Sequence, residues 1–305
     1  MVPPDLSKYQ AGTRKRVLVL GVSGMLGHML VRVLSQTHSI FGTISTAYDQ
    51  DKRIDRMLPK SQCIDQLDVT DQLKVDSVIR NVQPDTVLNC VGLIKHKMDK
   101  RRILDAVVIN SVFPHQLAEI CTPLGVRLIH FSTDCVFAGK PGMKRLTDVP
   151  DAVDVYGSTK RLGEVSYGTS LTLRTSFIGR QIAGDEELIE WVLSQRGQTI
   201  SGYQNAIYSG LTTRALSEVV AQVIDQCPDL VGLFQVASTP ISKFDLLSEL
   251  NARLRLGMTI KRNTTFECDR TLDGSEFSKV TGIQVPSWES MLSELCEDQA
   301  FYVQS

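Results

Sequence analysis

Three glycines separate a short apolar segment from a helical pattern near the start of the chain. The segment Arg16–Leu20 is followed directly by Gly21-Val-Ser-Gly24-Met-Leu-Gly27. With 21 glycines among 305 residues, chance gives roughly 0.1 triplets of this spacing. A strand, a glycine turn and a helix in this order bring bare backbone N–H groups and a helix N-terminus together, which suits a pyrophosphate. A purely structural turn is the alternative.

The first half of the chain alternates apolar runs with helical patterns. Pro114 lies inside the longest helical pattern and predicts a kink or break there. Apolar strands that are each followed by a helix pair in parallel and are covered on both faces. We therefore expect an α/β fold with a doubly wound parallel sheet of the Rossmann type. The expected strands are Arg16–Leu20, Ser39–Thr43, Cys63–Leu67, Thr86–Asn89, Arg127–Ser132 and Leu171–Arg174, and the expected helices are Met25–Leu34, Gln72–Asn81 and 102–123.

The alternation weakens after about residue 180 and predicts a smaller, mixed α/β part that binds the substrate. We expect an N-terminal extension at 1–14, a dinucleotide-binding domain at 15–180 and the smaller domain at 181–305, with segments that can interchange between the two. Helices are expected in the smaller domain at Glu186–Ser194, Thr213–Gln226, Ser242–Leu256 and Trp288–Ala300, and strands near Gly232–Val236 and Thr259–Arg262.

Composition and charge exclude several kinds of partner. Lysine and arginine number 33 and aspartate and glutamate 34, so no overall basic field favours nucleic acid or an anionic membrane. Seven scattered cysteines without a C-x-x-C pair argue for reduced thiols, and the histidines lack metal-ligand spacing. The polar start of the chain lacks an apolar export core, and Val17–Leu34 is too interrupted to span a membrane. We expect a cytoplasmic protein with no nucleic acid, membrane or metal partner.

A tyrosine and a lysine share one helical face in the segment Tyr156-Gly-Ser-Thr-Lys160. The spacing alone is weak, because Tyr48 and Lys52 repeat it. Position separates the two pairs: Tyr156 follows Thr133, the end of the fifth expected strand, by 23 residues. The carboxyl ends of parallel strands face the ligand crevice, so Thr133 and this helix can converge there.

The surrounding segments resemble the short-chain dehydrogenase/reductase superfamily, and within it the dTDP-4-dehydrorhamnose reductases. The resemblance rests on Ser132-Thr-Asp-Cys-Val-Phe137, on Tyr156-Gly with Lys160 and Gly163-Glu164, and on Arg174-Thr-Ser176. It covers roughly residues 16–180 well and the rest more loosely. In this family a nicotinamide supplies hydride, and the resemblance implies Tyr156 as the acid, Lys160 as the group that lowers the pKa of the phenol, and Thr133 as the holder of the ketone oxygen.

The resemblance also implies where the cofactor lies. Asp68 and Val69 would contact the adenine, although a turn or helix-cap role for Asp68 is nearly as plausible. The loop after the fourth strand would pass beside the cofactor. The complete expected cofactor set is Gly21, Ser23, Gly24, Met25, Leu26, Gly27, Ser45, Asp68, Val69, Cys90, Val91, Gly92, Asn110, Tyr156 and Lys160.

The residues at the end of the second expected strand indicate whether NAD(H) or NADP(H) is preferred. An acidic residue commonly binds the 2′-hydroxyl of NAD there, but no carboxylate occurs before Asp49, and Ser45 and Thr46 suit a 2′-phosphate. We expect NADP(H) to be preferred and NAD(H) to be possible.

The substrate is expected to be a nucleotide sugar, bound between the two parts. Cys135 departs from the tyrosine usual in the family, which leaves the particular sugar open. Trp191 and Tyr203 could stack on a base, and Arg214 could meet a diphosphate, although surface or core roles are as plausible. The expected substrate set is Asp134, Cys135, Ser176, Trp191, Tyr203 and Arg214.

The expected activity is NADPH-dependent reduction of a 4-keto sugar nucleotide in carbohydrate biosynthesis, with a homodimer as a possible assembly. Dehydration is disfavoured, because Cys135 follows Asp134 where the related dehydratases have a second carboxylate. Epimerisation uses the same tyrosine and lysine and stays open. A non-catalytic, NADP-binding regulatory subunit like that of methionine adenosyltransferase also resembles these reductases, so fold alone does not establish turnover.

Overall fold

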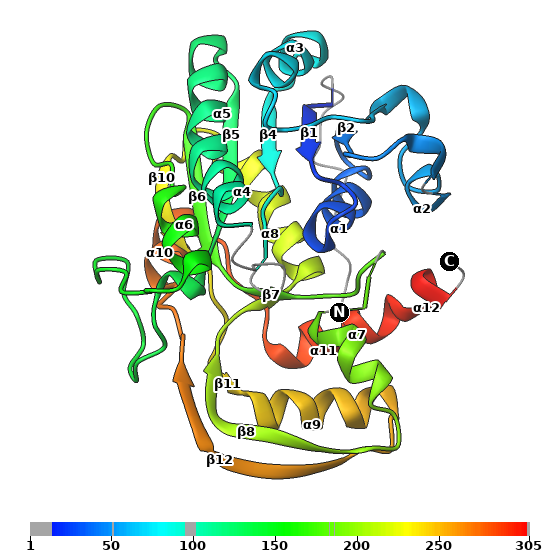
Figure 1. Cartoon of the computed structure of the whole chain (residues 1–305), viewed down its shortest axis with the longest axis vertical. Coiled ribbons are helices and arrows are strands. Elements are labelled where there is room, and N and C mark those ends of the chain that lie inside the picture. Colours follow the sequence, from blue (N-terminus) through cyan, green and yellow to red (C-terminus); the bar gives the residue numbers. More distant parts are fainter. Residues whose placement is uncertain (1–13, 51, 95–101, 183, 186, 304–305) are drawn as a thin grey trace.

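The computed structural model in Figure 1 describes residues 14–50, 52–94, 102–182, 184–185 and 187–303. The expected N-terminal extension lies almost entirely outside this part of the chain. A large sheet with its helices forms one part of the molecule, and a smaller part with a curved pair of strands lies beside it (Figure 1). None of the helices in the described ranges combines the length and apolar composition that a membrane span requires.

The large sheet has seven strands, all parallel, in the order β10-β6-β5-β4-β1-β2-β3. The reversal of strand order beside β1 makes the sheet doubly wound, as expected. Its strands are β1 (Arg16–Leu20), β2 (Ser39–Thr43), β3 (Cys63–Ile64), β4 (Thr86–Asn89), β5 (Arg127–Thr133), β6 (Ser170–Thr175) and β10 (Gly232–Gln235).

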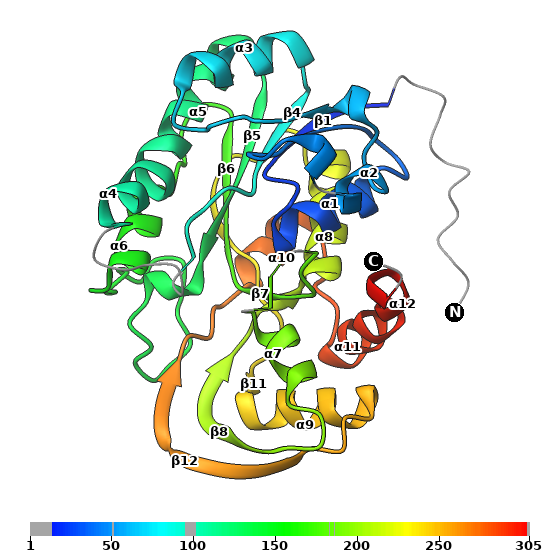
Figure 2. The ribbon, with the colours of Figure 1, turned by 45° about the vertical axis from the view of Figure 1, so that its right-hand side comes forward.

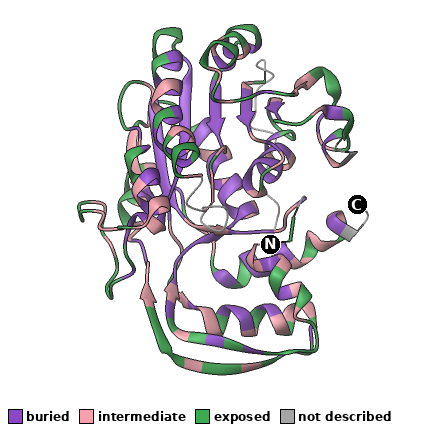
Figure 3. Cartoon of the chain, viewed as in Figure 1, coloured by how far each residue is buried: buried purple, intermediate pink, exposed green. Residues whose placement is uncertain are grey.

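Helices cover both faces of this sheet, which Figure 2 shows from the side and Figure 3 by burial. Alternate residues of β1 enter two separate cores: Val17 and Val19 pack with α1 (Met25–Leu34) and α8 (Thr213–Gln226), whereas Leu18 and Leu20 pack with α3 (Gln72–Val82) and α5 (Phe113–Cys121). Side chains alternate across a strand, so a strand buried on both faces must be apolar throughout. This is why the run of apolar residues predicted the strand.

The expected helix at 102–123 is divided in the structure. It consists of α4 (Ile103–Ala106), a π-helical stretch at Val107–Val112, α5 and a 3₁₀ turn at Thr122–Leu124. Pro114 lacks an N–H, so it cannot donate to the carbonyl of Asn110 in the preceding turn. The backbone nevertheless stays helical through Pro114, so the helix is not broken there, and the irregularity is a π-helical stretch that runs directly into α5.

The smaller part contains a strand that the sequence pattern missed. β8 (Thr199–Tyr208) pairs with β11 (Ile241–Ser242) and with β12 (Thr259–Asp269), which is much longer than expected. Residues such as Ser201, Gly202, Gln204 and Asn205 have low strand propensity, so only the pairing with β12 defines this strand. Figure 3 shows the exposed outer edge of these two strands, and α9 (Lys243–Leu254) packs against β8.

The chain passes back into the large sheet after residue 180. α8 packs against α1, and β10 pairs with β6, so residues of the expected smaller domain complete the large sheet. The division at residue 180 stays a prediction. The remaining elements are two-residue strands β7 (Phe177–Ile178) and β9 (Leu211–Thr212), and helices α2 (Lys52–Asp55), α6 (Val155–Leu162), α7 (Leu188–Ser194), α10 (Ser275–Thr281), α11 (Trp288–Glu297) and α12 (Gln299–Val303).

A buried ion pair connects α6 to the sheet. Arg174 on β6 donates two hydrogen bonds to the Glu164 carboxylate, at 2.8 and 2.7 Å, and both side chains are at most 9% exposed. Ser132 at the end of β5 donates a third at 2.7 Å, and Gln235 on β10 accepts from the guanidinium at 3.2 Å. A single network therefore joins three strands to the segment that follows α6.

We predict that Glu164→Gln destabilises the protein by about 3–5 kcal/mol, because removal of one partner leaves the Arg174 charge buried and uncompensated. Urea unfolding followed by circular dichroism measures this change. The control is Glu249→Gln, which breaks the exposed Glu249–Arg253 pair and should cost about 0.5 kcal/mol or less. Equal losses in the two variants would contradict the prediction.

Candidate functional site

The glycine turn has the form that a pyrophosphate cradle needs. A Cβ on Gly27 would lie 2.1 Å from the Gly21 carbonyl oxygen, so only glycine allows α1 to start this close to β1. A Cβ on Gly24 would meet only that same oxygen within 4 Å, at 3.3 Å. Gly24 is the N-cap of α1 and provides no side-chain cap. The first N–H groups of α1, on Met25, Leu26 and Gly27, are thus available to an anion.

The buried side chain of His28 contacts the glycine turn. His28 is completely buried; its Nδ1 lies 2.9 Å from the Gly24 carbonyl oxygen and its Nε2 2.7 Å from the Tyr302 hydroxyl of α12. Burial lowers the pKa of His28 to about 4. The neutral ring therefore links the glycine turn to the last helix of the chain.

The loop after β4 lies against the glycine turn. A Cβ on Gly21 would lie 3.1 Å from the Val91 side chain. The Cys90 N–H donates a hydrogen bond to the Leu20 carbonyl. Asn110 from the π-helical stretch holds this loop, accepting from the Leu93 N–H at 2.8 Å and donating to the Leu93 carbonyl at 3.0 Å. The structure thus brings the expected residues Cys90, Val91 and Asn110 to the carboxyl ends of β1 and β4.

The expected adenine side is more open. Ser45 is exposed just beyond β2 and has no carboxylate neighbour in sequence before Asp49. Asp68 is exposed, and its carboxylate accepts from the N–H and hydroxyl of Thr70, which lowers its pKa. Asp68 therefore makes the turn that was the alternative to an adenine contact, and neighbouring Val69 is half-buried.

Thr133 ends β5 and begins a polar turn. Its hydroxyl donates to Asp134 at 3.2 Å and accepts from the Cys135 N–H at 3.1 Å. Burial raises the pKa of the Asp134 carboxyl, and burial raises the pKa of the Cys135 thiol to about 12. Cys135 is therefore a neutral thiol, and it does not act as a thiolate nucleophile.

α6 lies directly on this turn. Asp154 caps its first turn through the Gly157 N–H at 3.0 Å, and a Cβ on Gly157 would lie 2.3 Å from the Cys135 carbonyl oxygen. Only glycine permits this approach, which places the Tyr156 hydroxyl within hydrogen-bonding reach of Thr133. The expected convergence of Thr133 and Tyr156 is thus present in the structure.

The electrostatics of Tyr156 differ from the expectation. Burial raises the pKa of its phenol above the usual value, with Cys135 adding to the rise and Thr133 opposing it. Lys160, which was expected to lower this pKa, donates instead to the Phe131 carbonyl at 2.7 Å and lies 3.4 Å from His130 Nε2. The Lys160 ammonium is thus bonded to the backbone of β5. With the protein's own groups alone around it, the Tyr156 phenol stays protonated.

Lys160 is itself buried, which lowers its pKa to about 8. His130 is fully buried beside it, and burial together with the ammonium lowers the pKa of the imidazole well below its usual value. Asn89 on β4 lies 3.1 Å from the other ring nitrogen. A neutral imidazole therefore separates Lys160 from β4.

The expected substrate residues are dispersed. Trp191 on α7 is 38% exposed, and Tyr203 on β8 is 40% exposed and packs on Phe266. Ser176 follows β6 and is half-buried. Arg214 is paired with Glu218 at 3.2 Å and Asp298 at 3.4 Å, so its guanidinium is already engaged.

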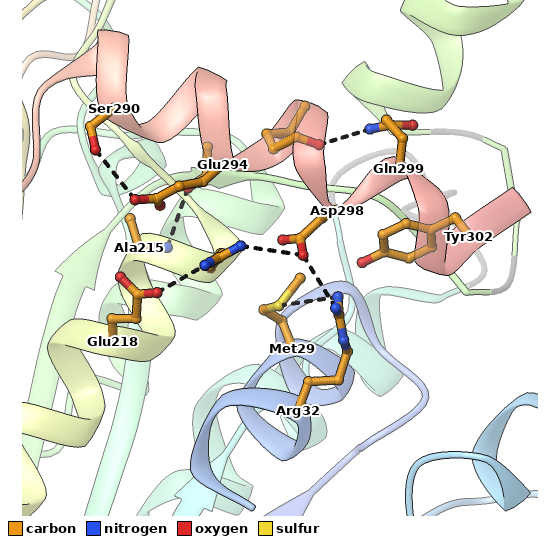
Figure 4. A network of polar contacts seen from close by, with 12 residues as sticks. Met29, Arg32, Ala215, Glu218, Ser290, Glu294, Asp298, Gln299 and Tyr302 are labelled. Carbon is orange, nitrogen blue, oxygen red and sulfur yellow. Dashed lines mark hydrogen bonds and ion pairs between the residues drawn. The ribbon is translucent and has the colours of Figure 1, made fainter. Parts of the chain in front are cut away.

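Figure 4 shows the network that engages Arg214. Asp298 also pairs with Arg32 of α1 at 3.2 Å, and Tyr302 lies next to it (Figure 4). A cavity of about 10 Å³, room for one water, lies here beside Met29 and Thr213. This network connects α1, α8 and the C-terminal helices. None of its residues is a sequence neighbour of Thr133, the expected holder of the ketone oxygen.

Three residues near Asp134 were missed by the sequence reasoning. Lys243 and Arg270 act electrostatically on Asp134, and Tyr208 does so from the end of β8. They come from the segment after residue 180, where no motif marked them, and only the pairing of β8 with β11 and β12 brings them together. Among the described residues, no group of three or more histidine, cysteine or acidic side chains could hold a metal ion.

Sequence comparison relates the chain to known proteins. Residues 15–301 match the family model described as the RmlD substrate binding domain. The chain is similar to the spore coat polysaccharide biosynthesis protein SpsK of Bacillus subtilis, 25% identical over 93% of this chain and 98% of that one. It is 31% identical to the dTDP-4-dehydrorhamnose reductase of Streptomyces griseus over 61% of this chain and 60% of that one.

A solved structure resembles the whole fold. The dTDP-4-dehydrorhamnose reductase of Bacillus anthracis, in complex with NADP, matches with a TM-score of 0.76 over 96% of this chain and 100% of that one, at 19% identity. This similarity supports the Rossmann-type sheet and the smaller part beside it.

We predict that His28 makes stability depend on pH. Its folded-state pKa of about 4 lies below the ordinary 6.5, so only the unfolded chain binds the proton between these values. Stability should fall by about 3 kcal/mol as the pH drops from 6.5 to 4 through this group alone. Urea unfolding across this range, compared between wild type and His28→Gln, isolates the contribution, and His115→Gln at a partly exposed site is the control. An unchanged pH slope in His28→Gln would refute it.

Proposed function

This chain belongs to the family of the RmlD substrate binding domain, and on that premise we propose that it is an NADPH-dependent reductase of a 4-keto sugar nucleotide. One relative is named for polysaccharide biosynthesis, and others are named as reductases of glycan biosynthesis or of dTDP-linked keto sugars. The observation that carries the proposal is the approach of Tyr156 to Thr133 at the carboxyl end of β5, with Lys160 of the same helix bonded to that strand at Phe131.

Reduction of a ketone requires a proton donor for the developing alkoxide. The Tyr156 phenol is protonated and half-buried, so it can donate to the oxygen as negative charge forms there. The Thr133 hydroxyl now donates to Asp134 and can turn to donate to the ketone oxygen instead. Both donors belong to backbone segments that Gly157 holds in contact, so their geometry is set before substrate arrives.

Lys160 has a supporting role in this proposal. Its ammonium is held at the Phe131 carbonyl and near the Cys90 thiol, at the boundary between β5 and the loop after β4. There its positive charge can bind a cofactor hydroxyl and favour transfer of the Tyr156 proton.

The cofactor we propose is NADPH, with NADH as a weaker alternative. When bound, its nicotinamide supplies the hydride, which no side chain of the protein can provide. Gly21, Ser23, Gly24, Met25, Leu26 and Gly27 would hold the pyrophosphate, and Cys90, Val91, Gly92 and Asn110 would line the nicotinamide side. Exposed Ser45 supports the 2′-phosphate, because a carboxylate there would repel it.

The related activities differ in what they need from the same residues. An epimerase also uses Tyr156 and Lys160, but it returns the hydride to its substrate and consumes no NADPH. A regulatory subunit would bind NADP and a partner enzyme without turnover. The protonated Tyr156 phenol beside Thr133 favours turnover over a regulatory role, since neither donor is needed for binding alone. Net consumption of NADPH distinguishes reduction from epimerisation.

Location and assembly also remain proposals. We place the protein in the cytoplasm, where its nucleotide-sugar substrate and its reduced thiols fit. A homodimer is proposed from the resemblance, without nucleic acid or membrane partners.

We predict that Tyr156→Phe lowers the steady-state turnover of the best keto-sugar nucleotide by about 10²–10⁴-fold, because it deletes only the proton donor. Affinity for NADPH should change little. The matched control is Tyr167→Phe, which removes the same hydroxyl from an exposed tyrosine bonded to His115. Wild-type turnover in Tyr156→Phe would refute the site assignment, and NADPH binding without turnover in wild type would favour the regulatory subunit.

We predict that wild-type protein binds NADPH at least about tenfold more tightly than NADH, and that Ser45→Asp reverses the preference. A carboxylate at the end of β2 accepts from a 2′-hydroxyl and repels a 2′-phosphate. Dissociation constants from fluorescence titration measure both effects. Ser201→Asp, on the exposed part of β8, is the control for added charge. A wild-type preference for NADH would overturn this assignment.

A further inference from the structure

Lys243 carries a positive charge for which the proposed chemistry has no use. It is the first residue of α9 and is half-buried, with its ammonium over the ring of Tyr208. Within the described part of the chain no hydrogen-bond acceptor is bonded to this nitrogen, and no carboxylate lies within 4.0 Å of it. Its positive charge is therefore available to an anionic ligand.

The groups that face Lys243 belong to the turn after β5. Asp134 and Cys135 are its strongest electrostatic neighbours, followed by Cys268, and the ammonium lies 5.0 Å from the ring centre of Tyr208. Asp134 directly follows Thr133, the residue proposed to hold the ketone oxygen, so Lys243 acts on the same turn. Burial raises the pKa of the Cys135 thiol, so it is uncharged here, and Asp134 is the one carboxylate among the groups that act on Lys243.

Arg270 adds a second cation to the same turn. It donates to the Phe137 carbonyl at 3.2 Å and to the Cys135 sulfur at 3.3 Å, and it also acts on Asp134. Asp154 also acts on Arg270, and it already caps α6 through Gly157. Two positive charges therefore share Asp134, which leaves the turn short of negative charge.

Tyr208 provides an independent observation. Its hydroxyl is buried without a hydrogen bond of good geometry among the described residues, although the Ser176 hydroxyl lies nearby. The buried Tyr208 hydroxyl and the Lys243 ammonium beside it are thus two donors without a hydrogen-bonded acceptor among the described residues.

We propose that Lys243 is a specificity-determining residue, whose ammonium binds a carboxylate carried by the sugar ring of the substrate. The inference rests on the proposed function and names the substrate more closely. The family's usual tyrosine at position 135 is a cysteine here, so the wall of the sugar site loses a bulky ring beside two cations. A carboxylate there would receive charge-assisted hydrogen bonds and complete the charge balance of the turn.

The test compares two nucleotide sugars that differ only in this group. Nucleoside diphosphate glucose has a hydroxymethyl group where the corresponding glucuronate has a carboxylate, and each is titrated calorimetrically into NADP⁺-saturated protein. Both the UDP and the dTDP forms are used, and the free nucleoside diphosphate is titrated alongside. The variants are Lys243→Met, Lys243→Arg, and Lys261→Met as a control on the exposed part of β12.

We expect wild type to bind the glucuronate about 10- to 100-fold more tightly than the glucose compound, as a charged hydrogen bond allows. Lys243→Met should abolish the preference, while Lys243→Arg and Lys261→Met keep it. Affinity for the free nucleoside diphosphate should be the same in all four proteins. Thermal unfolding of Lys243→Met should stay close to wild type, because the ammonium has no hydrogen bond to lose and gives up only its contact with the Tyr208 ring.

Three results would overturn the proposal. Equal affinity of wild type for the two sugars would show that no carboxylate is recognised, and a preference that survives in Lys243→Met would assign it to another residue. A loss of affinity for the free nucleoside diphosphate in Lys243→Met would mean that the ammonium binds phosphate. Failure of wild type to bind either sugar nucleotide would instead refute the proposed function, and with it this inference.

Discussion

The ion pair between Glu164 and Arg174 holds the site in place. It joins the end of α6 to β6, and through Ser132 and Gln235 it includes β5 and β10. Arg174 also stacks on Phe137, at 5.2 Å from the ring centre, in the loop after the polar turn. A buried pair of this kind adds little net stability, but it specifies geometry, because either charge alone would be costly. Glu164 and Arg174 are therefore structural residues that hold the helix carrying Tyr156.

Close backbone approach sets the distance between the presumed reacting groups. Gly157 allows α6 to rest on the Cys135 carbonyl, and the Asn110 carbonyl, left free by Pro114, lies against the other end of α6 at Gly163. Tyr156, Thr133 and Lys160 then come from segments that cannot move independently. The cost of ordering them is met when the protein folds, which is the usual origin of a preorganised site.

Burial decides the charge states in this site. It keeps the Tyr156 phenol and the Cys135 thiol protonated and lowers the pKa of Lys160 to about 8. A protonated phenol suits the donation of a proton to an alkoxide. The smaller part contributes different chemistry, since Lys243 and Arg270 bring positive charge to the same turn from α9 and from the end of β12. The proton donor thus comes from the large sheet and its α6, whereas the positive charge comes from the smaller part.

Local patterns in the sequence determined the doubly wound sheet, the glycine turn and the helix that carries Tyr156 and Lys160. The physical reason is that strands buried on both faces, tight turns and helical faces each impose a short-range pattern on the residues. Only the tertiary structure decided that β10 joins the large sheet, that Arg214 is engaged by Asp298, and that Lys160 bonds to β5 and leaves the pKa of Tyr156 to burial. It also decided the position of Lys243, because β8 has weak strand propensity and forms only through pairing with distant segments. Contacts between residues far apart in the chain leave no periodic signal, so charge states and partners at the site could not be obtained from sequence alone.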